Sequence, residues 1–284
     1  MSIRSVFIAK ETYPYYEEVQ VEFDWFGGFA LSQKRKCQIG LHENFLTRYP
    51  DKKILEISMA SLMSLGAKLS AMNLSKRVDG GMTSVESAFQ SSRIYKNGVK
   101  TIGPFPEYMF LPGKECKKIV KKLSEGMISY EYFFEGMTFY APPYHISLFY
   151  DYLYLNALLE PENNAVREQL LKGGFDAFSD LATKSLNCQA RSAAIFVGLV
   201  RAGLIDKVRS YESYLDLFRT EKDGKPKGQN AYENVPMLYK NKNISSLIYI
   251  PCTVDRDAVE RYYESCCSGL TNKKEGNNYL DLCG

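Results

Sequence analysis

Histidine and tryptophan are scarce in this chain of 284 residues, which has two histidines and one tryptophan. Its seven cysteines are scattered, and no two of them form a CxxC pair. Because zinc sites are built from cysteine and histidine ligands at short, regular spacings, the sequence predicts no zinc site. We expect no other metal and no cofactor. An odd number of dispersed thiols is typical of a reducing compartment, which predicts a cytoplasmic protein.

Long apolar runs are also missing. No stretch of about 18 uninterrupted apolar residues occurs, so the sequence predicts no membrane span. Residues 1–20 include Glu11, Glu17 and Glu18 before any long apolar run, which argues against a signal peptide. The formal net charge of +3 and the pI near 8.3 allow a nucleic-acid partner without arguing for one.

Hydrophobic residues make up 45% of the chain and charged residues 24%, which is typical of a globular protein. Alternation and apolar runs predict strands at 19–25 and 52–58, an extended piece at 65–74 and a hairpin at 130–143 that turns at Glu135-Gly136. Helical periodicity predicts helices at 32–48, from 83 onward, and at 114–126, 147–171 (broken at Pro161) and 186–204. The expected fold class is α+β, mostly helical around a small sheet.

One acidic residue, Glu86, lies in the otherwise small and apolar stretch 83–95. Thr83 followed three residues later by Glu86 matches a capping box, in which the glutamate side chain reaches back to the amide of the threonine. The alternative is a general acid or base held at the start of a helix. Both roles can coexist, because a cap also fixes the direction of a carboxylate.

Lys68 lies between small and apolar residues in GAKLSAMNL. A solvated lysine at a strand edge is the simpler interpretation. A lysine partly buried in a pocket would instead be an amine nucleophile toward a carbonyl group.

Polar residues open the helix expected at 186–204. Asn187 is suited to capping, whereas Gln189 and Arg191 together with backbone amides could bind a diphosphate. For Arg191 the alternative is a structural ion pair. Asp180 and its neighbour Asp176 are either surface charges or acceptors for ribose hydroxyls.

Two basic segments, 32–36 and 114–123, are either solvated helix faces or contacts to a phosphate backbone. Trp25 could stack on a base, although a tryptophan more often anchors a core. His145 follows Pro142-Pro143 and is more typical of a packed histidine than of a catalyst. None of these signals alone identifies a reaction.

Four segments resemble, in order and spacing, the NADAR (YbiA-like) family: LSAMNL (69–74), TSVESAFQSSRIY (83–95), FYDYLYLNALL (149–159) and KSLNCQARSAAIF (184–196). Segments 22–36 and 55–71 resemble the branch found beside DarT-type DNA ADP-ribosyltransferase toxins, where the protein is the antitoxin. The resemblance covers about residues 19–217. It implies a NADAR-like catalytic domain at 1–218. The polar stretch 219–230, which contains glycine and proline, predicts a linker to a small C-terminal extension at 231–284.

The resemblance implies hydrolysis of the N-glycosidic bond between ADP-ribose and the amino group of guanine in DNA, as an antitoxin or counter-defence activity. Glu86 would transfer the proton at the anomeric carbon, and Lys68 would form an imine with the opened ribose. Four residues match positions of the family motifs and would help to bind the substrate: Ser70, Gln90, Arg93 and Asn187. The other candidates for substrate binding are Trp25, Asn73, Asp180, Gln189 and Arg191. The sequence departs from the family pattern at Ser87, where the family has histidine, and at Arg93, where it usually has lysine.

Two other functions are compatible with the sequence. One is cleavage of a small N-glycoside, such as a riboflavin-pathway intermediate. The other is a non-catalytic module that binds ADP-ribose or a toxin protein. The expected partners are therefore ADP-ribosylated DNA, ADP-ribose and a DarT-type toxin, with no membrane.

Overall fold

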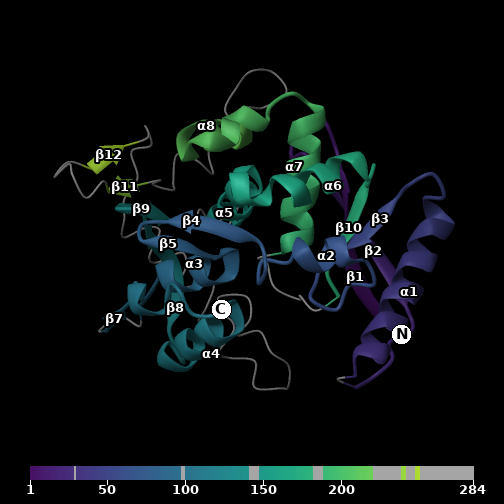
Figure 1. The fold of residues 1–284 in the computed structure, drawn as a ribbon, viewed down its shortest axis with the longest axis horizontal. Coiled ribbons are helices and arrows are strands. Elements are labelled where there is room, and N and C mark those ends of the chain that lie inside the picture. Colours follow the sequence, from purple (N-terminus) through teal and green to yellow (C-terminus); the bar gives the residue numbers. More distant parts are fainter. Residues whose placement is uncertain are drawn as a thin grey trace. The chain divides into compact units, whose positions relative to one another are not determined.

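The computed structural model describes residues 1–28, 30–96, 100–140, 147–181, 188–219, 238–240 and 247–249 (Figure 1). The chain divides into two compact units. The first unit contains Met1–Arg77 and Asp151–Leu217, and the second contains Val78–Tyr150 and the chain from Phe218 onward. In the described part of the chain, no helix combines the length and the apolar character needed to cross a membrane.

The first unit contains a four-stranded sheet in the order β2 (Tyr16–Phe23), β1 (Ser2–Ala9), β10 (Ala177–Ser179) and β3 (Ile54–Glu56). Strand β1 is antiparallel to β2 and β10, whereas β10 and β3 are parallel, with Ser179 opposite Glu56. The predictions of strands at 19–25 and 52–58 are confirmed by β2 and β3. Strand β1 was not predicted, because its run of consecutive buried residues does not alternate.

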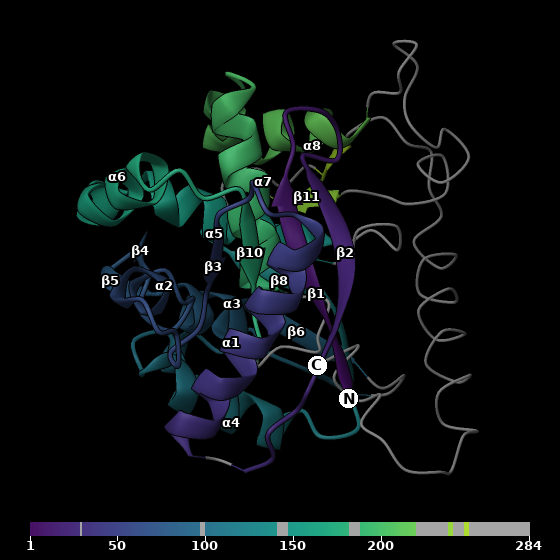
Figure 2. The same cartoon turned by 90° about the vertical axis from the view of Figure 1, so that its right-hand side faces the viewer.

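Two helices pack on this sheet (Figure 2). The inner stripe of α1 (Leu31–Arg48) consists of Cys37, Leu41 and Phe45, spaced one turn apart, and it packs with Val6 and Ile8 of β1. Helix α7 (Gln189–Arg201) contacts β1 and β10. The whole segment Val6–Ala9 is buried, as expected for a strand covered on both faces.

The second unit contains an antiparallel sheet in the order β7 (Thr101–Ile102), β6 (Arg93–Lys96), β8 (Ile128–Phe134) and β9 (Met137–Tyr140). Strands β8 and β9 form the predicted hairpin. Its turn residues, Glu135 and Gly136, both have positive φ, 47° and 78°, which suits a two-residue turn between twisted strands. Residues 141–143, at the end of the predicted hairpin, lie outside the described residues.

Helix α3 (Val85–Ser92) is completely buried in this unit, and α4 (Gly113–Leu123) packs beside it. Aromatic rings position α3: the Phe89 ring lies 5.5 Å from that of Tyr132, and Phe149 lies 4.6 Å from Tyr132 and 4.8 Å from Phe139. Ring pairs at these separations add favourable edge and offset contacts to the burial itself. The start of α3 is therefore held by a rigid aromatic core.

The other elements complete the α+β fold that the sequence predicts. They are α2 (Ser64–Lys68), β4 (Ser75–Val78), β5 (Gly81–Ser84), η1 (Pro106–Tyr108), α5 (Leu148–Leu159), η3 (Pro161–Asn163), α6 (Asn164–Lys172), η4 (Ile205–Arg209), α8 (Tyr211–Arg219), β11 (Leu238–Lys240) and β12 (Leu247–Tyr249). The break at Pro161 is confirmed, because it separates α5 from α6. The boundaries 1–218, 219–230 and 231–284 remain a prediction, and most of 219–284 lies outside the described residues.

The prediction of an extended piece at 65–74 is wrong. Residues 64–68 form helix α2, and turns follow to Leu74. Gly66 explains the tight packing of this short helix: a Cβ atom at this position would lie 1.9 Å from the carbonyl oxygen of Glu56. Since only glycine allows this approach, a tertiary contact stabilises a helix too short to be stable alone.

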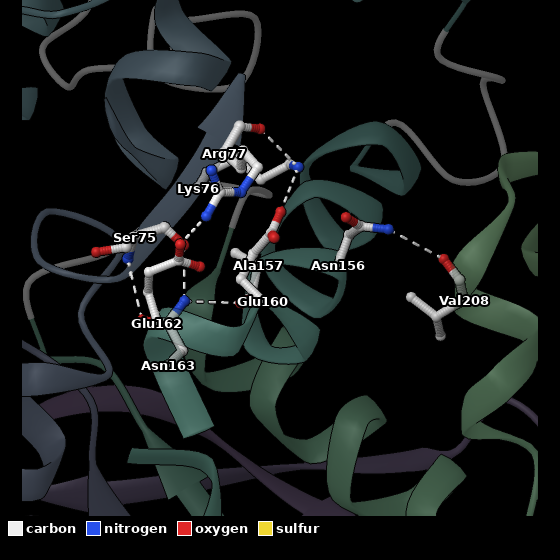
Figure 3. A network of polar contacts seen from close by, with 9 residues as sticks. All are labelled: Ser75, Lys76, Arg77, Asn156, Ala157, Glu160, Glu162, Asn163 and Val208. Carbon is white, nitrogen blue, oxygen red and sulfur yellow. Dashed lines mark hydrogen bonds and ion pairs between the residues drawn. The ribbon is translucent and has the colours of Figure 1, made fainter. Parts of the chain in front are cut away.

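A polar network joins β4 to the helices after it within the first unit (Figure 3). Lys76 Nζ lies 2.8 Å from Glu160 Oε1 and also donates to the Arg77 carbonyl at 2.9 Å. Asn163 donates to the carbonyls of Ser75 and Ala157, each at 2.7 Å. Lys76 is buried, so its charge depends on these acceptors.

Replacing Glu160 by alanine is expected to lower the free energy of unfolding by about 2 kcal/mol, because it removes a charged hydrogen-bond acceptor from the buried Lys76 ammonium. Arg77→Ala is the matched control, since the side chains of Arg77 and Glu162 are 56% and 33% exposed. Loss of such an exposed pair costs below about 1 kcal/mol. Urea unfolding of both variants measures the two losses in the free energy of unfolding. Equal losses would show that the buried charge of Lys76 does not make its ion pair more important than the exposed pair.

Candidate functional site

Glu86 lies at the second position of α3, with 6% of its surface exposed. Its carboxylate accepts a hydrogen bond of 3.0 Å from Gln90 Nε2, one turn further along the helix. Lys117 Nζ, from the neighbouring α4, lies 3.3 Å from the same oxygen. The positive end of the α3 dipole and the Lys117 ammonium both stabilise a negative charge on Glu86.

The capping box expected between Thr83 and Glu86 is wrong. The helix is capped by Ser84, whose hydroxyl accepts the amide of Ser87 at 3.1 Å. Thr83 donates its hydroxyl to the carbonyl of Met109 instead. The Glu86 carboxylate is therefore held by Gln90 and Lys117, and the acid–base interpretation does not compete with a capping role.

Cys116 precedes Lys117 in α4, and its thiol lies near enough to Glu86 to interact with the charge of this carboxylate. Burial, reinforced by the charge of Glu86, raises the pKa of the Cys116 thiol to about 12. The thiol stays protonated at neutral pH and is unsuited to act as a nucleophile. Lys117, by contrast, has a half-exposed side chain and a charged end at Glu86. The sequence did not single out Lys117, because it is one of five lysines between 114 and 122.

Arg93 begins strand β6 and is buried. Its Nε donates to Ser129 Oγ at 3.2 Å, and its guanidinium carbon lies 4.6 Å from the Tyr95 ring centre and 5.5 Å from that of Phe89. These contacts place Arg93 within the packing of α3 on the sheet. Its expected part in substrate binding stays a prediction.

Three of the predicted substrate-binding residues meet in the first unit. Gln189, the first residue of α7, donates its amide to Asp180 Oδ2 at 3.0 Å and to the Ile57 carbonyl at 2.7 Å. Its Oε1 accepts the Ala71 amide at 2.8 Å and the Ser70 hydroxyl at 3.3 Å. The amide of Gln189 thus makes all four hydrogen bonds open to it. It joins Ser70 and Asp180, both buried, into one polar cluster.

Arg191 forms the structural ion pair that the sequence offered as the alternative to a diphosphate contact. Its expected part in binding a diphosphate stays a prediction. Arg191 Nη2 lies 3.2 Å and 3.1 Å from the two carboxylate oxygens of Asp151, and Ser192 Oγ donates to Asp151 at 2.6 Å. Both charged residues are buried. Although burial opposes the charge, the Asp151 carboxylate raises the pKa of Arg191 above its ordinary value.

Two candidates are exposed. Lys68 ends α2 with an exposed side chain, so burial does not activate it in the way the sequence suggested. Asn73 is also exposed and donates to the Ala67 carbonyl at 2.8 Å, which ties down the turn after α2. Their roles in an imine and in substrate binding stay predictions.

Trp25 is 46% exposed, so the expectation of a core anchor is wrong. The guanidinium of Arg4 lies 5.0 Å from the centre of its ring, and the Phe23 ring packs against it edge-on at 6.1 Å. A surface tryptophan beside a cation is compatible with base stacking. Lys34, Arg35 and Lys36 are exposed on the first turns of α1 in the same unit.

Asn187 and His145 lie outside the described residues. The structure therefore gives no position for the predicted late asparagine. The predicted residues that it does bring together form two groups, one in each unit. Glu86 and Gln90 are in the second unit, and Ser70, Asp180 and Gln189 are in the first.

Comparison with known proteins gives the family. Residues 2–228 match the family model of the DarT1-associated NADAR antitoxins, which extends the resemblance in both directions from 19–217. No match was found among curated proteins. A match over 2–228 of 284 residues covers most of the chain, including α3 and the start of α7. The chain therefore belongs to the family of NADAR antitoxins associated with DarT1.

Proposed function

We propose that this chain is a hydrolase that removes ADP-ribose from guanine bases of DNA and thereby protects DNA from a DarT-type toxin. The observation that carries the proposal is the environment of Glu86: a buried carboxylate at a helix start, engaged by Gln90 and Lys117 and not used as a cap. Family membership supports the antitoxin role.

The reaction breaks the bond between the anomeric carbon of the ribose and the amino nitrogen of guanine. Water supplies the oxygen that bonds to the anomeric carbon, one of its protons goes to the leaving amine, and positive charge develops on the sugar meanwhile. An ionised Glu86 can stabilise that charge and accept the proton of the attacking water. Gln90 fixes the carboxylate, and the half-exposed Lys117 ammonium is a proton donor beside it.

Asp180 supplies the second part of the proposal. Its carboxylate, fixed by Gln189, is an acceptor for ribose hydroxyls. Lys68 is the candidate amine for a route in which the opened sugar forms an imine. The hydrolytic route through Glu86 does not require that imine.

The exposed Trp25 and the exposed basic residues of α1 and α4 favour DNA over a small metabolite as the substrate. Single-turnover incubation with a guanine-ADP-ribosylated oligonucleotide is expected to release free ADP-ribose and restore the unmodified strand. The same modification on an isolated nucleoside is expected to react more slowly, because it lacks the phosphate contacts. Absence of release from the oligonucleotide would reject the proposed activity, and faster turnover of the nucleoside would reject the DNA preference.

A further inference from the structure

Glu56, the last residue of β3, is a buried carboxyl group that the proposed chemistry does not use. Only 1% of its surface is exposed. It accepts a hydrogen bond of 2.5 Å from Ser179 Oγ and one of 3.0 Å from the amide of Leu181. These two donors lie on either side of Asp180 in the sequence, at the end of β10.

The parallel pairing of β3 and β10 explains this geometry. Ser179 lies opposite Glu56 in the register, so both strands end at the same edge of the sheet. At that edge the Glu56 carboxyl group holds the segment that carries Asp180, and Gln189 holds the Asp180 carboxylate itself. Two attachments from different elements therefore fix the direction of Asp180.

The charges around this edge favour a proton on Glu56. Burial, followed by the negative charge of Asp180, raises the pKa of Glu56 to about 7. His42, on α1, shares a hydrogen bond of 2.9 Å with Ser179 Oγ, and burial lowers its pKa to about 4, so it is neutral at pH 7. Arg4, on β1, interacts with Asp180 and donates to the Leu181 carbonyl at 3.4 Å.

Two further titratable groups face Asp180. Tyr154, on α5, and Cys188, before α7, both have raised pKa values, caused by burial first and by the Asp180 charge second. Both therefore stay neutral near pH 7. Near pH 7, close to its own pKa, Glu56 carries a proton in about half of the molecules.

We propose that Glu56 is a positioning residue for substrate binding: it clamps Ser179 and Leu181, so that Asp180 points at a ribose hydroxyl. When Glu56 carries its proton, no second negative charge lies beside Asp180. The inference rests on the proposed function and deepens it. When Glu56 loses its proton, two buried carboxylates face each other, which disfavours the arrangement and repels the diphosphate of the ligand. ADP-ribose affinity is thus expected to fall as the pH rises through the pKa of Glu56.

The test is a calorimetric measurement of ADP-ribose binding to the full chain at about pH 6 and about pH 8, one below and one above the pKa of Glu56. The diphosphate of ADP-ribose keeps its charge over this range, so a change reports on the protein. Wild-type affinity is expected to fall about fivefold between the two pH values. Glu56→Gln, a neutral mimic of the protonated acid that keeps an acceptor for Leu181, is expected to bind equally well at both.

Glu56→Leu removes the hydrogen bonds to Ser179 and Leu181 and is expected to weaken ADP-ribose binding about tenfold at both pH values. The control is Glu43→Gln, which changes an exposed glutamate on α1 and is expected to bind as the wild type does. Circular dichroism verifies that each variant is folded. An equal pH dependence in wild type and Glu56→Gln would overturn the inference. If the wild type also releases ADP-ribose from DNA, the proposed function survives that outcome, whereas failure of the wild type to bind or release ADP-ribose would overturn both.

Discussion

Glu86→Gln is expected to lower the single-turnover rate of ADP-ribose release at least about 100-fold, equivalent to about 2.7 kcal/mol of transition-state stabilisation. The substitution removes the negative charge and the proton acceptor but keeps the size of the side chain. In the wild type, Gln90 Nε2 donates to the Glu86 carboxylate at 3.0 Å. The amide oxygen of the new glutamine can accept the same hydrogen bond, so the fold of α3 is expected to persist. ADP-ribose affinity should change little, because the loss concerns the reaction step.

The matched control is Glu125→Gln, an exposed glutamate of the same unit that follows α4. It makes the same chemical change without touching α3, and its rate is expected to equal that of the wild type. Release by Glu86→Gln at the wild-type rate would leave the activity intact and remove Glu86 from its catalytic role. A drop caused by loss of folding would show as a lower melting temperature, which Glu125→Gln should not share.

The acid at α3 could be found from the sequence, but its local contacts could not. Thr83 and Ser84 are adjacent hydroxyl residues, and either can cap a helix. The choice is made by the Met109 carbonyl, which takes the Thr83 hydroxyl and leaves Ser84 as the cap. That partner lies 26 residues away in the chain, and no local pattern predicts it.

The contact between Lys117 and Glu86 also could not be predicted from the sequence. The periodicity of 114–126 predicts a basic helix correctly, and Cys116 and Val120 lie on its buried face. Which of the neighbouring lysines reaches Glu86 depends on how that face docks on α3. From the sequence, all of them were either solvated side chains or phosphate contacts, because a run of lysines gives no means to separate one from the others.

The cluster around Gln189 was predicted residue by residue but not as a cluster. Ser70 and Gln189 are 119 positions apart, and only the folded first unit brings them within 3.3 Å. Glu56 was missed for a different reason. It lies in a strand with apolar neighbours, and its burial beside Asp180 follows from the parallel pairing of β3 and β10, a topology that the sequence pattern does not specify.

Arg191→Met is expected to lower the free energy of unfolding by about 3 to 5 kcal/mol, because it removes the cation that pairs with the fully buried carboxylate of Asp151. The sequence offered Arg191 as a diphosphate contact. A surface ligand contact would give a different result, with loss of binding and little change in stability. Denaturant unfolding of the single variant therefore separates the two roles.

The double variant Asp151→Leu/Arg191→Met tests the physical reason. Ser192 Oγ loses Asp151 but keeps the carbonyl of Cys188 at 3.2 Å, so the Ser192 hydroxyl keeps a partner when both charges are removed. Replacing a buried ion pair by apolar side chains of similar size is often neutral, so the double variant is expected to recover most of the stability lost in Arg191→Met. The single variant Asp151→Leu completes the comparison. If the stability losses of the two single variants add up in the double variant, the cost comes from the packing of the individual side chains and not from an uncompensated charge. Recovery would show that the ion pair between the first turns of α5 and α7 is replaceable as a unit, although neither member can be removed alone.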